Sequence, residues 1–229
     1  MGMEAEDQTA TRTAAEALSA GYLPNNSPAI QRLSISIYSA LSRGRPVDAA
    51  ALAARLDCGE LEIENLLSAL PPSVIDRDGD GRITAFIGLS LSPTRHRFEL
   101  DTRTLFTWCV LDALFLPELL GEEARVATQC PESDILIVLR VAPVRMVDCQ
   151  PPAAVMSMVA PEIAACRDDL RGAFCSHVSF FANRGSFDRW AKGRLGTTCV
   201  PIGEAYDLGR RRNKARFPDI AFGGSGFSA

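Results

Sequence analysis

Apolar residues at helical spacing mark the part of the chain that follows residue 25. Their recurrence every three or four positions predicts a helix over residues 26–41. The same spacing predicts a second helix over residues 48–56 and a third over 59–70, which two prolines end. Residues 74–87 hold two short apolar stretches around a Gly-rich turn, the pattern of a β-hairpin. Three helices followed by a hairpin are typical of a winged-helix module, which we place at residues 25–90.

The charge of the third predicted helix decides whether this module binds DNA. The helix carries Glu60, Glu62 and Glu64 and has no lysine or arginine. A helix that enters a DNA groove needs positive charge near the phosphates. We therefore expect the module to be structural, either a cover or a docking surface, and expect no nucleic-acid partner.

The next segment, Thr104–Leu116, is almost entirely apolar and predicts a helix buried on all sides. We expect Asp101 or Thr102 to cap this helix. Its one side chain that is charged at neutral pH in water is Asp112, and a buried carboxylate must be paired, neutralised or functional. Cys109 lies three residues earlier, so in a helix its thiol and the carboxylate share a face.

Beyond Gly121 the pattern changes from helical to extended. Three segments predict successive strands of an antiparallel sheet, and the later segments predict a further strand, an alternating half-buried strand and short helices. The predicted strands are 125–130, 134–141, 144–149, 153–159, Phe174–Phe181 and 198–202, and the predicted helices are 161–170, 186–192 and 204–216. The fold class expected is α+β: the winged-helix-like module, then a mixed α/β core at 91–216 with an antiparallel sheet and a buried central helix. Residues 1–24 are expected to be a mobile leader and 217–229 a disordered tail.

Composition excludes several classes of protein. The 229 residues are 47% hydrophobic and 23% charged with a formal net charge of −4, which indicates a globular chain without general affinity for polyanions. The polar N-terminus lacks the apolar stretch of a signal peptide, and no apolar run reaches the length of about 20 residues that spans a membrane. We expect a cytoplasmic protein with no membrane partner.

Seven cysteines need an explanation in such a compartment. They are residues 58, 109, 130, 149, 166, 175 and 199. An odd number in a reducing environment indicates thiols or metal ligands more than a disulfide framework. The cysteines and histidines lack zinc-finger spacing, so we do not expect a structural zinc site.

Two of the cysteines lie in stretches that together resemble the organomercurial (alkylmercury) lyase family. The stretches are F-E-L-D-x-R-x-L-F-T-W-C-V-L-D-A-L-F-L-P, residues 98–117, and F-C-S-H-V-S-F-F, residues 174–181. The resemblance covers residues 88–181 and implies an enzyme that cleaves a carbon–mercury bond by protonation, releasing a hydrocarbon and Hg(II). It implies that Cys109, Asp112 and Cys175 form the functional site. It also implies no cofactor, a need for exogenous thiols, and transfer of Hg(II) to small thiols or a mercuric reductase.

The chemistry of mercury justifies these residue types. Mercury is a soft metal that prefers thiolate sulfur to nitrogen or oxygen. Two thiolates make the mercury-bound carbon basic, and a proton must then reach that carbon. Asp112 can supply this proton in two ways: it holds one at rest because burial raises its pKa, or it relays the proton that a thiol releases on binding mercury. The sequence leaves both open.

The evidence for a functional role is weaker for the other candidate residues. Trp108 is expected to pack beneath the site, with an aromatic wall for the organic group as the alternative. Cys130 matches a family cysteine at a strand end and is expected to be a structural support or a weak helper of the site. In an alternating strand His177 faces the same side as Cys175, so it is either a partner of the site or an ordinary core histidine. The basic run of residues 210–216 is expected to be a solvated helix end, or else a docking patch for an acidic partner.

The rival hypothesis is a non-enzymatic sensor that binds a soft metal, mercury or copper, through a winged helix and a thiol site. The acidic third helix counts against DNA binding. A simple metal binder would also have no use for Asp112.

Overall fold

The computed structural model describes residues 26–160 and 162–222. The predicted mobile leader of residues 1–24 lies outside these residues. Two antiparallel sheets and a set of helices make an α+β fold, as expected. The large sheet has eight strands in the order β1-β2-β3-β5-β4-β6-β7-β8, and the small sheet has three in the order β10-β9-β11.

The bounds of the elements follow the chain. The helices are α2 (Pro28–Leu41), α3 (Ala49–Leu56), α4 (Glu60–Ser68), α5 (Val110–Leu120), α6 (Ile163–Asp168), α7 (Leu170–Ala173), α8 (Arg184–Ala191) and α9 (Ile202–Arg216), with 3-10 turns η1 (Pro72–Val74) and η2 (Cys175–His177). The strands are β1 (Ile75–Arg77), β2 (Ile83–Phe86), β3 (Leu89–Ser90), β4 (His96–Leu100), β5 (Arg103–Thr107), β6 (Ala124–Gln129), β7 (Leu136–Ala142), β8 (Arg145–Gln150), β9 (Val155–Val159), β10 (Phe180–Phe181) and β11 (Thr197–Pro201).

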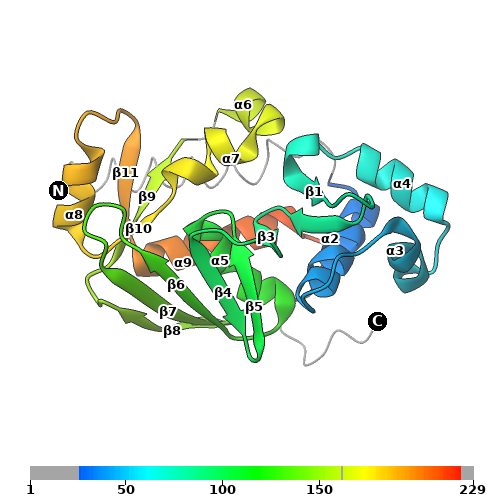
Figure 1. Cartoon of the computed structure of the whole chain (residues 1–229), viewed down its shortest axis with the longest axis horizontal. Coiled ribbons are helices and arrows are strands. Elements are labelled where there is room, and N and C mark those ends of the chain that lie inside the picture. Colours follow the sequence, from blue (N-terminus) through cyan, green and yellow to red (C-terminus); the bar gives the residue numbers. More distant parts are fainter. Residues whose placement is uncertain (1–25, 161, 223–229) are drawn as a thin grey trace.

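The first three helices and the hairpin β1–β2 occur in the predicted order. Ser27 caps α2 and Asp48 caps α3 through their side chains, which explains where both helices begin. The helices gather at one end of the molecule, away from the small sheet and α8 (Figure 1). The hairpin does not stand apart: β2 pairs with β3 and β3 with β5, so it continues into the large sheet. The winged-helix assignment and the boundary at residue 90 remain predictions.

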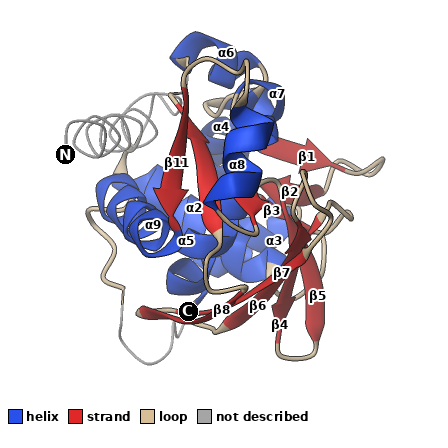
Figure 2. Cartoon of the chain, turned by 90° about the vertical axis from the view of Figure 1, so that its left-hand side faces the viewer, coloured by secondary structure: helices blue, strands red, loops and turns tan. Residues whose placement is uncertain are grey.

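The pair α5–α9 lies between the two sheets. Helix α5 packs on β5, β6 and β7, and α9 packs on α5 and on β9 and β11 (Figure 2). From Val110 to Leu119 every side chain of α5 except that of Glu118 is buried, which confirms the central buried helix. Among the described residues, no helix combines the length and hydropathy needed to cross a bilayer.

Five predictions about local structure were wrong. The apolar run after residue 102 begins as strand β5, so α5 starts at Val110 and continues through Pro117. Asp101 and Thr102 therefore form the turn of the β4–β5 hairpin, where Asp101 has φ 45°, and do not cap the helix. Strand β4 lies between the predicted hairpin and the predicted central helix, where no strand was expected.

The other two corrections concern the C-terminal half. Only Phe180–Phe181 of the predicted 174–181 strand pairs in a sheet, because η2 occupies its beginning. The predicted tail is ordered as far as residue 222: Phe217 is buried, and Asp219 accepts a hydrogen bond from Gln31 of α2 at 2.9 Å. Residues 223–229 lie outside the described structure.

Candidate active site

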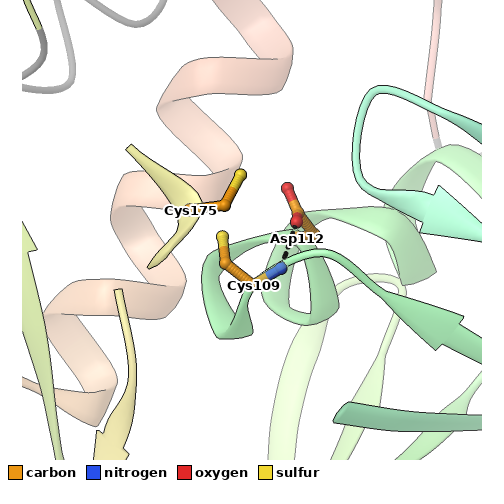
Figure 3. Close-up of side chains that lie close together, drawn as sticks. All are labelled: Cys109, Asp112 and Cys175. Carbon is orange, nitrogen blue, oxygen red and sulfur yellow. Dashed lines mark hydrogen bonds between the residues drawn. The ribbon is translucent and has the colours of Figure 1, made fainter. Parts of the chain in front are cut away.

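Cys109, Asp112 and Cys175 lie together in the interior. Their two sulfur atoms and one carboxylate oxygen all fall within 4.8 Å of one another. The exposed fractions are 0%, 7% and 4% respectively, so the site is nearly closed to solvent. Figure 3 shows Cys109 and Asp112 on the first turn of one helix, with Cys175 facing them from a separate segment. The structure thus brings together the three residues that the motifs single out.

The start of α5 positions two of these residues. Cys109 is the N-cap residue, with extended backbone angles of φ −142° and ψ 176°, and Asp112 is the third residue of the helix. The Cys109 backbone N–H donates to Asp112 Oδ2 at 2.8 Å, while the Asp112 backbone N–H points back to the Cys109 sulfur. This reciprocal arrangement is a capping box with cysteine in the place where serine or threonine is usual. The helix terminus therefore fixes the thiol and the carboxyl relative to each other.

A separate segment supplies the second thiol. Cys175 begins the 3-10 turn η2, after α7 and before β10. Ser157 of β9 holds the end of this turn, because its hydroxyl donates to the His177 carbonyl at 2.7 Å and accepts from the Ser179 N–H at 2.9 Å. In a 3-10 turn, neighbouring side chains point in different directions. Cys175 is buried, whereas His177 is exposed, so the expectation that the two face the same side was wrong.

Burial sets the electrostatics of the pair on α5. It raises the pKa of the Cys109 thiol well above its ordinary value of 9.0, and the neighbouring Cys175 and Asp112 add to the effect. Burial also raises the pKa of Asp112 from 3.8 to about 6, although bonds to Cys109 and the charges of Arg212 and Arg171 oppose the rise. At neutral pH the resting site thus holds a neutral Cys109 thiol beside a mostly ionised carboxylate.

Two arginines near Asp112 were not among the predicted site residues. Arg171 of α7 stacks on the Trp108 ring at 4.0 Å and forms an ion pair with Asp76 of β1. Arg212 of α9 is buried, with its guanidinium 4.0 Å from the centroid of the Phe115 ring. The expectation that the basic run is a solvated helix end fails for Arg212. Arg212 and Arg216 are both buried. They lie four residues apart and so share one face of the helix, and this spacing is the feature of the sequence that could have indicated it.

Trp108 and Cys130 occupy supporting positions. Trp108 is buried beside Cys109, and Arg171 covers one face of its ring. Cys130 follows β6 and is fully buried. Among the described residues, the group of three side chains that could hold a metal is Cys109, Asp112 and Cys175, and Cys130 is not part of it. The supporting roles of both residues remain predictions.

Comparison with known proteins agrees with this geometry. The sequence model of a family described as alkylmercury lyase matches residues 89–213. An alkylmercury lyase of Pseudomonas putida is 34% identical over 195 residues, covering 85% of this chain and 88% of that protein. Alkylmercury lyases of Staphylococcus epidermidis and Streptomyces lividans are 35% and 36% identical, covering 74% and 76% of this chain and 76% and 79% of theirs.

A solved structure shares the fold. The crystal structure of the mercury-bound form of MerB2 superposes with a TM-score of 0.74 at 20% identity, covering 91% of this chain and 99% of that one. This structural likeness shows a shared fold, whereas the sequence relationships show membership of a family, because they extend over most of the chain at more than 30% identity. The chain belongs to the alkylmercury lyase family. These findings favour the enzyme over the metal-responsive sensor.

Proposed function

We propose that this protein cleaves the carbon–mercury bond of alkyl and aryl mercury compounds, with Cys109 and Cys175 as mercury ligands and Asp112 as the proton carrier. The observation that supports these roles is the buried group of two sulfur atoms and one carboxylate within 4.8 Å. Thiolates suit a soft metal, and the carboxyl suits the protonation of carbon. The thiolates bind the metal and the carboxyl supplies the proton.

The first step is exchange of thiols onto mercury. The substrate R–Hg–X, where X is a small thiolate, reacts with one site thiol, so that an S–Hg bond replaces the Hg–X bond and X leaves as HX with the thiol proton. When the second thiol binds mercury, its proton passes to Asp112. Metal coordination makes this loss favourable, since a metal-bound thiol is deprotonated.

The second step is protonation of carbon. Asp112 gives its proton to R, the electron pair of the C–Hg bond becomes the C–H bond, and Hg(II) stays on the two thiolates. No electron is gained or lost. Because the pKa of Asp112 is raised only to about 6, most of the carboxyl is ionised at neutral pH and can accept a thiol proton. The relay therefore has more support than a proton held at rest.

Product release completes the reaction. Hg(II) bound to two buried thiolates leaves by exchange onto incoming thiols, so we expect turnover to need exogenous thiol and no cofactor. Small thiols or a mercuric reductase are the expected acceptors. Such chemistry needs reduced cysteines, and Cys109 and Cys175 are both free thiols. A reducing compartment such as the cytoplasm maintains that state.

Release of hydrocarbon tests the proposal. Purified protein is incubated with phenylmercury or methylmercury and excess thiol, and benzene or methane is followed by gas chromatography with mass detection. In D₂O, protonolysis predicts that each product molecule carries one deuterium from solvent. Hydrocarbon at the level of the thiol-only control would refute the activity. Deuterium-free product would refute the proton step.

A further inference from the structure

A two-residue turn lies directly behind the Asp112 carboxyl. Phe86 of β2 pairs with Leu89 of β3, so Ile87 and Gly88 form the whole connection between the strands. Their φ angles are 32° and 96°. Positive φ at both positions defines the hairpin turn of type I′, which Asn and Gly adopt readily. Ile87 is β-branched and buried, and a residue of this kind in that region is strained by about 1–3 kcal/mol.

Three hydrogen bonds hold the turn in this conformation. The Tyr38 hydroxyl of α2 donates to the Ile87 carbonyl at 2.9 Å, and the Ile87 N–H donates to the Val74 carbonyl of η1 at 3.0 Å. On the other side, the Trp108 N–H donates to the Gly88 carbonyl at 2.9 Å. The turn thus connects the N-terminal helices to the backbone just before Cys109. Strain that persists under such constraint is characteristic of functional sites.

The turn also touches the carboxyl itself. A Cβ atom built on Gly88 would lie 2.4 Å from both Cγ and Oδ1 of Asp112 and 2.8 Å from its Cβ. These are overlaps, so the bare backbone of Gly88 lies flat against the Asp112 side chain. The Cys109 N–H holds Oδ2 from the other direction at 2.8 Å. The carboxyl is therefore confined between the helix terminus and the turn.

We propose that the Ile87–Gly88 turn is a backstop that fixes the Asp112 carboxyl for proton transfer, with Gly88 as a positioning residue and Tyr38 as the anchor of the turn. The inference rests on the proposed role of Asp112. It gives the N-terminal helices a part in catalysis that involves no contact with substrate. Displacement of a reacting group by about 1 Å can cost about 100-fold in rate, so a loose carboxyl would slow protonation without loosening mercury.

Two glycine variants test the backstop. Gly88→Ala introduces both backbone strain and the overlap with Asp112, whereas Gly81→Ala in the β1–β2 hairpin has a similar φ of 81° with nothing within 4 Å of the added carbon. We expect Gly88→Ala to lower the single-turnover rate of benzene release by about 100-fold. Binding of Hg(II), measured by the ultraviolet absorbance of the mercury–thiolate bonds, should be kept. Gly81→Ala should match wild type in both measurements.

A pair of tyrosine variants covers the case in which Gly88→Ala does not fold. Tyr38→Phe removes the hydroxyl that holds Ile87, and Tyr206→Phe removes a buried hydroxyl that has no hydrogen-bond partner among the described residues. We expect Tyr38→Phe to slow benzene release by about 10-fold with mercury binding unchanged, a loss within the range for one buried hydrogen bond. Tyr206→Phe should behave as wild type. Equal rates for the two variants would overturn the proposal.

Asp112→Asn, measured in parallel, separates the two ways to fail. If this variant releases benzene normally, the proton role of Asp112 and the proposed backstop are both refuted. If it is inactive while Gly88→Ala matches Gly81→Ala, the proton role survives and the backstop alone is refuted. A Gly88→Ala protein that loses mercury binding in proportion to rate would also refute it, since the turn would then act on the whole site.

Discussion

Cys109 and Cys130 are both fully buried thiols, but their surroundings shift the pKa of the sulfur in opposite directions. Burial, Cys175 and Asp112 raise the pKa of Cys109 well above 9.0. At Cys130 burial also acts to raise the pKa, but the Ser133 side chain and the backbone N–H groups of Ala182, Glu132 and Ser133 outweigh it, so the pKa is lowered. One site disfavours the thiolate and the other accommodates it.

If Cys109 binds mercury as proposed, a stable thiolate is not what makes a mercury site. Cys130 already has hydrogen-bond donors around its sulfur and, among the described residues, belongs to no group of three or more side chains that could hold a metal. Cys109 has the reverse, a neighbouring thiol and a carboxylate that repel its negative charge and would be relieved by a bound cation. Binding of a cation is therefore favoured where Cys175 and Asp112 disfavour a negative charge on the Cys109 sulfur.

The largest effect should come from exchanging sulfur for oxygen at each site. Cys109→Ser should reduce benzene release from phenylmercury by at least about 1000-fold, because a hydroxyl is a poor ligand for a soft metal. The same holds for Cys175→Ser. Cys130→Ser should remain within a few-fold of wild type in the same gas-chromatographic assay. If Cys130→Ser is as inactive as Cys109→Ser, the distinction between the two sites is wrong.

The next effect separates binding from chemistry at the Cys109 site. Asp112→Asn keeps the shape and an oxygen for the Cys109 N–H but cannot carry the proton. We expect the rate of hydrocarbon release to fall by about 100-fold or more, as for loss of an acid–base group, while Hg(II) binding in equilibrium dialysis is retained. Loss of binding equal to loss of rate would assign Asp112 to the metal alone.

Stability should depend on pH in a direction set by Asp112. Its folded pKa of about 6 lies above the ordinary value of 3.8, so the folded state binds the proton more tightly than the unfolded state. The stabilising protonation is complete below about pH 4 and is lost as pH rises through 6, a change of about 3 kcal/mol at most. Denaturant unfolding should therefore show Asp112→Asn to be more stable than wild type at pH 8. The difference between them should shrink towards pH 4, and a constant difference would contradict the assignment.

The smallest effect concerns the donors around Cys130. Cys130→Ala removes the acceptor of the backbone N–H groups of Ala182, Glu132 and Ser133 and should lower the free energy of unfolding by about 1–3 kcal/mol. Cys130→Ser keeps an acceptor and should lose less. Denaturant titration of both variants with mercury-free protein measures this. Equal stability of the two would mean that packing, not hydrogen bonding, is what Cys130 contributes.

The grouping of the site residues was predicted from the sequence more completely than the fold was. Helices α2, α3, α4 and α9 and strands β6, β7 and β8 follow apolar spacing closely and were predicted within a few residues. Strand β4 was missed although His96, Phe98 and Leu100 alternate and are all buried. The signal was masked because a histidine reads as polar. Here the ring is buried, bonds to Thr128 at 2.9 Å, and has its pKa lowered to about 3 by burial and by Arg95.

What failed at the site was geometry that only tertiary contacts decide. Cys109 and Asp112 were predicted from their spacing, but a helix cap instead of a helix interior joins them. Cys175 came from the family motif, and its 3-10 turn depends on Ser157, a residue from another part of the chain. Gly88 carried no signal beyond being a glycine. Its role depends on where α5 lies.

The cysteine at the start of α5 has a consequence for protein engineering. Serine is among the best residues for a helix N-cap, and cysteine is not. A library screened for melting temperature would therefore favour Cys109→Ser, and Asp112→Asn beside it at neutral pH. On the proposed mechanism, each round of selection for heat resistance would enrich chains that no longer release hydrocarbon from organomercurials. Stabilisation of this scaffold has to be scored on hydrocarbon release from the first round.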